Sequence, residues 1–183
     1  LFDLTFDRSA STLLGYTQTE LEHYFTPYMP ETESYLGLSR EALLAKIREW
    51  YNGYSWDLRT RVYNPYSILS FFQAQAFRNF WFESGTPTFL PKLMHRNGVY
   101  RVDAVEVDET TLGNYDLKRL ELAPVLFQTG YLTLKNCDEF GLFTLGYPNR
   151  EVQASMSMYL LAEWSHQEAT YATPMVVNLH KAF

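Results

Sequence analysis

The stretch that decides the fold reads WYNGYSWDLRTRVYNPYS and spans residues 50–67. It holds six aromatic residues, an Asn-Gly pair and an Asn-Pro pair. Residues 42–51 carry apolar side chains at helical spacing, which predicts a helix that runs up to the Asn-Gly pair. Ser39 is expected to cap its start, because a serine hydroxyl can accept a free first-turn N–H. Asn-Gly is also a hairpin signal, but the periodicity favours Gly53 as a left-handed cap that ends the helix.

A tight hairpin and a second helix are expected to follow. Residues 54–56 and 61–63 are rich in aromatic and β-branched residues and flank a polar turn at 57–60, which predicts two short strands. Asn64 and Pro65 then form an N-cap followed by a proline at the first helical position. The stretch therefore predicts a helix, a hairpin and a helix held together by aromatic rings.

This unit also supplies the candidate functional residues. One interpretation is a docking or nucleotide-sensing element that presents Arg59 and Arg61 on the hairpin. The other is a small aromatic core that orients the two helices. The candidate docking or sensing residues are Tyr51, Asn52, Gly53, Tyr54, Trp56, Arg59, Arg61, Asn64, Pro65 and Trp81.

Upstream, a capping box formed by Thr17 and Glu20 predicts the start of another helix. Pro27 and Pro30 are expected to end this helix, and residues 31–38 to form a polar loop. Its buried side is expected to carry Leu21, Tyr24 and Phe25.

The segment after the second helix contains Phe80-Trp-Phe82, which is too apolar to lie exposed and is expected to be buried. Thr86 is expected to cap a further helix. Residues 100–111 alternate loosely and are expected to be extended.

The C-terminal third predicts a winged-helix-like unit. Residues 116–128 form a helical pattern, residues 131–135 and 142–145 alternate as a hairpin, and a helix is expected from residue 151 with Asn149 as its cap. Along the first hairpin strand, Leu132 and Leu134 should face one way, and Thr133 and Lys135 the other. A DNA-binding wing offers Lys and Arg to phosphates, whereas this wing holds Lys135 against Asp138 and Glu139. We therefore expect a wing that packs against protein.

Composition limits the possible functions. The chain has 183 residues, 46% hydrophobic and 17% aromatic, with a net charge of −6, so it is globular and not a nucleic-acid clamp over its whole surface. Cys137 is its single cysteine, which excludes an internal disulfide and fits a reducing cytoplasm. No run of 18 apolar residues exists, so we expect no membrane partner. The sequence begins without Met, and we expect a fragment of a longer protein.

Known catalytic patterns are missing, so we expect no catalytic, cofactor-binding or metal-binding residue in this chain. Gly141 and Gly146 have the internal spacing of a P-loop but lack the lysine that follows it. Four separate histidines, without a cysteine pair, do not form a zinc pattern. Asp103, Asp116 and Lys118 imitate the acid-acid-lysine pattern of metal-dependent nucleases, but Asp116 is better explained as a first-turn acid of a helix.

Five motifs in order carry a family resemblance: TLLGYTQTELE at 12–22, WYNGYSW at 50–56, VYNPYS at 62–67, FWFESGTPTFL at 80–90 and GYPNREV at 146–152. Together they resemble the AAA-ATPase-like proteins, which join a P-loop ATPase-like domain to a C-terminal PD-(D/E)XK nuclease-like domain and are mostly bacterial and archaeal. The hairpin turn departs from the family, with Asp57-Leu58 where the family often has Asp-Gly. No catalytic residue of the family falls on a position of this chain.

The resemblance implies a mainly α fold with short β-hairpins, in which a helical lid region precedes the winged-helix-like unit. Residues 1–112 would belong to the ATPase-like region, 113–150 to the winged-helix-like unit and 151–183 to the lead-in to the nuclease-like domain. The segment would couple the nucleotide-binding and nuclease-like domains of a cytoplasmic, nucleic-acid-directed parent without doing chemistry. ATP and Mg²⁺, and possible nucleic-acid binding, would belong to the parent. The alternative is a stand-alone interaction module that binds a partner protein through its aromatic surface.

Overall fold

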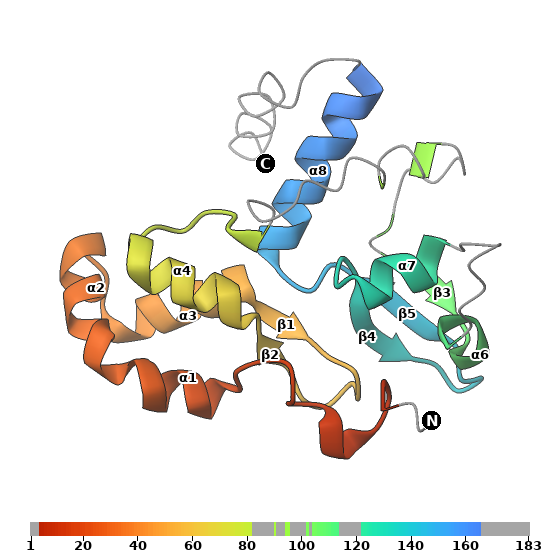
Figure 1. Ribbon diagram of the computed structural model, residues 1–183, viewed down its shortest axis with the longest axis horizontal. Coiled ribbons are helices and arrows are strands. Elements are labelled where there is room, and N and C mark those ends of the chain that lie inside the picture. Colours follow the sequence, from red (N-terminus) through yellow and green to blue (C-terminus); the bar gives the residue numbers. More distant parts are fainter. Residues whose placement is uncertain are drawn as a thin grey trace.

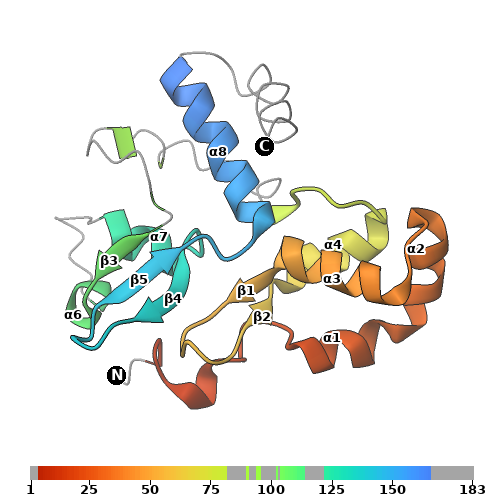
Figure 2. The same ribbon diagram turned by 180° about the vertical axis from the view of Figure 1, so that it is seen from behind.

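The computed structural model describes residues 4–81, 90, 94–95, 102, 104–113 and 122–165, with side chains as far as residue 162 in the last range. The fold is mainly helical with two small antiparallel sheets, as the sequence predicts. In Figure 1 the helices of the N-terminal half lie on one side, a three-stranded sheet with short helices lies on the other, and α8 rises between them. Figure 2 shows the same arrangement from behind.

The N-terminal helical unit contains η1 (Arg8–Ala10), α1 (Gln18–Phe25), η2 (Thr26–Tyr28), α2 (Met29–Leu36), α3 (Arg40–Tyr51) and α4 (Pro65–Ala74). Their starts follow local capping chemistry. Thr17 and Glu20 form the predicted capping box, and Ser39 accepts an N–H at the start of α3. Asn64 accepts the N–H groups of Tyr66 and Ser67, so its predicted cap of α4 is confirmed.

Two predictions for the first helices are wrong. Residues 31–38 are not a polar loop: most of them belong to α2, whose first turn contains Pro30. A proline can end one helix and open the next, because the missing N–H is not needed in a first turn. Tyr24 is 59% exposed, whereas Leu21 and Phe25 are buried as predicted.

The central hairpin consists of β1 (Asn52–Tyr54) and β2 (Val62–Tyr63), so its strands lie closer to the helices than predicted. α3 does not end in a left-handed cap. Asn52 is extended at φ −87° and ψ 159°, and the chain passes directly from helix to strand. Gly53 does have a positive φ of 131°, but it lies within β1, where the pairing register shifts.

The C-terminal unit contains β3 (Val105–Val107), α6 (Glu109–Leu112), α7 (Leu122–Gln128), β4 (Thr133–Cys137) and β5 (Phe143–Gly146). The predicted hairpin is confirmed as β4–β5, and β3 pairs with β5 to give the strand order β3-β5-β4. Of residues 100–111, the extended prediction holds only for β3 among the described positions. Gly130, at φ 77°, ends α7 as expected.

Both faces of β4 are covered at Thr133. Leu132 and Leu134 are buried, but Thr133 on the opposite face is buried as well. Thr133 Oγ1 accepts the Ser55 N–H at 2.7 Å and donates to the Ser55 carbonyl at 3.0 Å. The central hairpin therefore covers the second face of β4 at Thr133.

α8 (Arg150–Ser165) begins with Asn149 Oδ1 accepting the Val152 N–H at 3.1 Å, which confirms the predicted cap. Two cores lie on either side of the central hairpin. Tyr63 belongs to the core of the helical unit, whereas Tyr54 and Val62 belong to the core that includes the three-stranded sheet and α8. The hairpin is therefore a structural part of both halves.

Several predictions lie outside the described residues: the burial of Phe82, the cap at Thr86, the nuclease-like pattern of Asp103, Asp116 and Lys118, and the fold of residues 166–183. The domain boundaries at 112/113 and 150/151 stay predictions. Among the described residues, no helix combines the length and the apolar character that crossing a membrane requires.

Gly53 is expected to tolerate no side chain. A Cβ there would lie 2.0 Å from the Pro148 carbonyl oxygen, in addition to the strain of φ 131°. Strain and overpacking together should make Gly53→Ala cost about 3 kcal/mol or more in unfolding free energy. Gly37→Ala is the matched control, because Gly37 also has positive φ (64°) but nothing within 4 Å of its Cβ position. It should cost only about 1–2 kcal/mol. Equal losses in urea unfolding would contradict the role assigned to the Pro148 contact.

Candidate functional site

The two halves meet where β1 passes beneath the segment that leads into α8. Gly53 lies against the backbone of Pro148, and the close approach of these two segments leaves no room for a side chain at residue 53. Next to this contact, the Arg150 guanidinium pairs with Glu49 Oε1 at 2.7 Å and lies 5.1 Å above the Trp50 ring. The helix α3, the strand β1 and the start of α8 are therefore joined at one place.

The strongest polar contact of this junction belongs to Glu151, which is fully buried in the first turn of α8. Its Oε1 accepts the N–H groups of Phe80 and Trp81 at 2.8 and 3.0 Å, and its Oε2 accepts the Ser67 hydroxyl at 2.7 Å. Hydrogen bonds to a carboxylate are stronger than those between neutral groups. Glu151 thus fastens α4 and the chain at residues 80–81 to α8.

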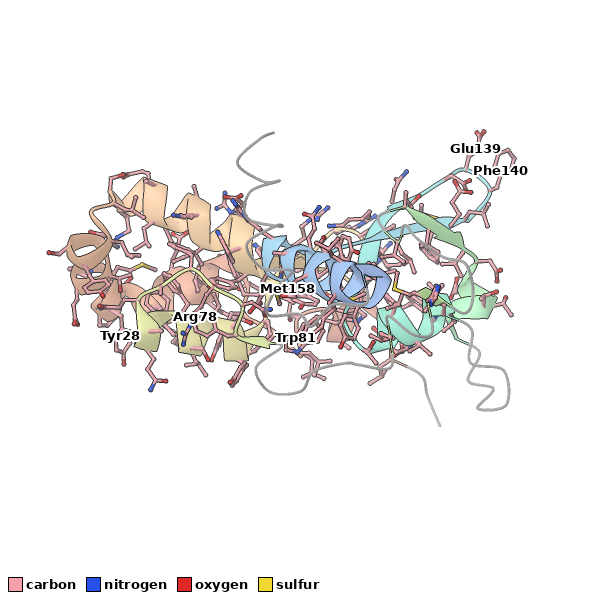
Figure 3. The ribbon with its side chains drawn as sticks, turned by 90° about the horizontal axis from the view of Figure 1, so that it is seen from above. Tyr28, Arg78, Trp81, Glu139, Phe140 and Met158 are labelled. Atoms are coloured by element: carbon pink, nitrogen blue, oxygen red, sulfur yellow. The ribbon has the colours of Figure 1, made fainter. Side chains whose placement is uncertain are left out.

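A second set of polar contacts supports the same arrangement. The Tyr51 hydroxyl donates to the Arg78 carbonyl at 2.9 Å and accepts the Arg78 N–H at 3.2 Å. Asn79 donates to the Ser155 hydroxyl on α8. Figure 3 shows Trp81 just below α8 and Arg78 to its left, on the side of α4. The connection that leaves α4 is therefore held at four successive residues, 78–81.

Tyr54 lies deeper in the junction. Burial, and to a smaller extent the Glu151 charge, raise the pKa of its phenol well above the usual range, while the Asn64 and Asn149 side chains partly offset this. Among the described residues, neither the Tyr54 hydroxyl nor Asn149 Nδ2 has a hydrogen-bond partner. The phenol is therefore neutral and structural at physiological pH.

An aromatic pocket of about 240 Å³ opens beside this junction. We call it the aromatic pocket. Its lining residues come from the N-terminal segment, the central hairpin, the start of α4, residue 81 and the turn after α7. None of these described residues is charged. They are Leu14, Tyr54, Trp56, Val62, Tyr63, Asn64, Pro65, Trp81, Gln128, Thr129 and Gly130.

Gly130 shapes one wall of the aromatic pocket. A Cβ at this position would lie 3.5 Å from the Tyr54 ring and 3.6 Å from the Trp81 ring. The Tyr54 and Trp56 rings are nearly parallel, with an interplanar angle of 17° and centroids 6.5 Å apart. The pocket therefore presents flat apolar walls with amide and hydroxyl groups at its margin.

Lys135 lies at the seam between the hairpin and β4. Its Nζ donates to the Pro148 carbonyl at 3.4 Å, and no carboxylate among the described residues pairs with it. Burial, and to a smaller extent the Arg61 charge, lower the pKa of its ammonium to about 8. Lys135 is therefore a half-buried contact of the junction, whereas Asp138 and Glu139 are exposed in the turn between β4 and β5.

The predicted candidate residues fall into three groups. Tyr54, Trp56, Asn64, Pro65 and Trp81 line the aromatic pocket. Tyr51, Asn52 and Gly53 belong to the packed junction, which favours the aromatic-core interpretation for them. Arg59 and Arg61 are exposed on the hairpin.

Sequence reasoning missed Glu151, Ser67 and Pro148 as site residues. Glu151 lies in the GYPNREV motif, where it has the spacing of an ordinary first-turn acid of a helix. Only the apolar neighbours at 152 and 156 indicate that this side of α8 is buried.

The described geometry suits binding and positioning. Among the described residues, no group of three or more His, Cys, Asp or Glu side chains could hold a metal ion. The buried carboxylate of Glu151 at the centre accepts three hydrogen bonds from groups of the fold.

Comparisons with known proteins give one curated relative. It comes from Azotobacter chroococcum mcd 1, is described as "Uncharacterized protein in vnfD 5'region", and is 35% identical over 175 residues. The match covers 93% of this chain and 32% of the relative, so the chain spans about a third of the relative's length. No family model matches the chain, and no solved structure matches it.

Glu151→Leu is expected to cost about 3 kcal/mol or more in unfolding free energy, because it leaves two buried N–H groups and a buried hydroxyl unpaired. Glu151→Gln should cost less, since its oxygen can still accept the two N–H groups and its amide can donate to Ser67. Glu49→Gln breaks only the exposed pair with Arg150 and should cost less than about 1 kcal/mol. Denaturant unfolding of the three variants measures these losses of unfolding free energy. A loss for Glu49→Gln as large as that for Glu151→Leu would contradict the prediction.

Lys135 is expected to make stability depend on pH in the alkaline range. Its folded pKa of about 8 lies below the unfolded value of about 10.4, so the unfolded state binds more protons between these limits. Stability contributed at this site therefore rises as pH increases from about 8 toward 10. Lys135→Met should be more stable than the wild type at pH 7, with the difference shrinking by pH 9.5. A difference that stays constant from pH 7 to 9.5 would rule out this assignment.

Proposed function

We propose that this chain is a non-catalytic coupling segment of a longer protein that joins an ATPase-like domain to a PD-(D/E)XK nuclease-like domain. The five motifs that resemble the AAA-ATPase-like family support the proposal. The length of the curated relative, about three times the matched region, is in keeping with it. ATP, Mg²⁺ and any nucleic acid would then be bound by other parts of the parent.

The strand order supports the winged-helix part of the proposal. In winged-helix folds, the strand that precedes the last two helices pairs with the final strand of the wing hairpin. Here β3 precedes α6 and α7 and pairs with β5, which gives the order β3-β5-β4. The wing would thus be the β4–β5 hairpin.

Charge favours a wing that contacts protein. Asp138 and Glu139 occupy the tip, and the single lysine of β4 is half-buried against Pro148. A DNA-binding wing needs exposed cations to neutralise phosphates. We therefore infer packing against the nucleotide-binding or nuclease-like domain of the parent.

The observation that carries the coupling role is the Glu151 carboxylate, which binds three donors from two segments of the helical half while its own helix packs in the other core. A displacement of α4 or of residues 80–81 must move α8 or break these buried hydrogen bonds. In the proposed parent, α8 would lead toward the nuclease-like domain. This connection can transmit a nucleotide-dependent movement.

The second candidate function is a protein-interaction module, and the aromatic pocket favours it. The pocket is open, uncharged along its described lining and walled by aromatic rings. Such pockets hold the side-chain anchors that dominate protein interfaces. This function is compatible with the coupling role but does not need ATP.

The isolated chain is expected to show neither ATP hydrolysis nor DNA cleavage. Its sequence has no P-loop, and its described residues hold no cluster that could bind a metal ion. Both activities are measured with Mg²⁺ against a preparation purified identically from cells with empty vector. Turnover above that background, abolished by a point substitution within residues 1–183, would contradict the prediction.

Coupling is tested in the longer protein encoded around this chain. The upstream region should contain a P-loop, and Ser67→Ala should weaken the Glu151 contact without removing either domain. ATP hydrolysis should persist, while the ATP dependence of nuclease activity should fall. Glu49→Gln is the control, because it alters an exposed contact between α3 and α8 and should leave both activities unchanged. The absence of a P-loop upstream, or equal coupling in both variants, would overturn the proposal.

A further inference from the structure

The end of the β4–β5 hairpin carries an aromatic side chain that the fold does not use. Phe140 is 81% exposed, and Figure 3 shows it with Glu139 projecting from the tip of the hairpin. Burying an aromatic ring of this size stabilises by about 1.5–3 kcal/mol. A ring held in water at a hairpin tip is therefore a candidate anchor for another surface.

The turn holds Phe140 in a defined position. Asp138 Oδ1 accepts the N–H groups of Phe140 and Leu142 at 2.9 and 2.8 Å, and the Asp138 carbonyl accepts the Gly141 N–H at 3.2 Å. Gly141 completes the turn at φ 84°. Because the backbone is already ordered, docking this ring loses little conformational entropy.

The aromatic pocket has the properties that such an anchor requires. Its volume of about 240 Å³ lies below the range of about 300–1,000 Å³ that is usual for small-molecule sites, so it suits a single side chain. Tyr54, Trp56 and Trp81 give it ring faces and edges, against which another aromatic ring packs favourably. None of the described lining residues carries a charge, so within the pocket these residues favour an apolar ring over an anionic ligand such as a nucleotide phosphate.

The residues that adjoin the anchor and those that adjoin the pocket residues in the sequence carry opposite charges. Asp138 and Glu139 directly precede Phe140. Arg61 precedes the pocket residue Val62, and Arg59 lies in the turn between Trp56 and Val62; both arginines are exposed. Opposite charges around an aromatic anchor increase the association rate and fix its orientation.

We propose that Phe140 of one copy of this chain inserts into the aromatic pocket of a second copy, with Asp138 and Glu139 facing Arg59 and Arg61. The ring does not serve its own pocket, because Figure 3 places Phe140 and Trp81 at separate parts of the molecule. Two copies can exchange anchors reciprocally, which gives a closed dimer in which each pocket is completed by its partner. This inference does not rest on the proposed ATPase or nuclease-like parent, and it assigns the tip of the β4–β5 hairpin to a second copy in place of a domain of the parent.

The first experiment measures self-association of the chain by sedimentation velocity from micromolar to millimolar concentration. Phe140→Ala should weaken association at least tenfold without changing the circular dichroism spectrum, because Phe140 is exposed. Tyr35→Ala is the matched control, since Tyr35 is 70% exposed on α2 but belongs to neither the tip nor the pocket. A monomeric wild type at the highest concentration, or equal effects of the two substitutions, would overturn the proposal.

The second experiment uses complementation between two variants. The Phe140→Ala chain keeps an intact pocket, and the Trp56→Ala chain keeps an intact anchor, so neither should associate with itself. Their mixture can form one anchor-to-pocket contact and should associate more tightly than either variant alone, and more weakly as salt is raised. The circular dichroism spectrum of Trp56→Ala must first show that this variant is folded. A mixture that then associates no better than the separate variants would refute the assignment.

The same measurements are repeated in the longer gene product. Persistence of Phe140-dependent association in a parent without a P-loop would retain this inference while rejecting the proposed function. Loss of Phe140-dependent association in a parent that is an active ATPase would reject this inference while retaining the proposed function.

Discussion

The arrangement of this chain depends on one buried carboxylate. Glu151 has no exposed surface, and burying a charge is costly unless hydrogen bonds replace its water. Three donors do so, and they come from α4 and from the chain at Phe80 and Trp81. The requirement to satisfy this group therefore brings segments more than sixty residues apart in sequence to one point.

The central hairpin solves the complementary problem of joining two hydrophobic cores. Tyr63 packs among the helices of the N-terminal half, whereas Tyr54 and Val62 pack with the sheet and α8. A two-stranded hairpin is marginal by itself, so it needs such neighbours on its faces. In return, Ser55 bonds to Thr133 and covers β4. The hairpin and the three-stranded sheet are thus mutually dependent, and the hairpin contributes side chains to the cores of both halves.

Local chemistry made most helix starts predictable from sequence. Thr17, Ser39, Asn64 and Asn149 each accept an N–H within the first turn, and that interaction involves only neighbouring residues. The aromatic content of residues 50–67 indicated a packing element, and half of the candidate residues line one pocket. The remaining site residues could not be predicted, because the partners of Glu151 and Gly53 are distant in sequence and no local pattern encodes them.

Gly53 shows why a correct backbone prediction can have the wrong cause. Its positive φ was expected from a helix cap, but the glycine lies within a strand. A Cβ at this position would lie 2.0 Å from the Pro148 carbonyl oxygen, so the site has no room for a side chain. The Asn-Gly pair permits either outcome, since glycine allows both conformations. The long-range approach of Pro148 decides between them, and helical periodicity carries no information about it.

Leu58 presents the opposite case, a positive φ without glycine. It adopts φ 63° in the hairpin turn. A left-handed conformation costs an ordinary residue about 1–2 kcal/mol. Asp57 holds the turn by accepting the N–H groups of Arg59 and Thr60 at 2.9 and 2.7 Å, and the Leu58 side chain packs against the second core. Contact of the partly buried leucine with this core offsets part of the strain, because removing its apolar surface from water is favourable, and it adds an apolar contact between the hairpin and the core that includes α8.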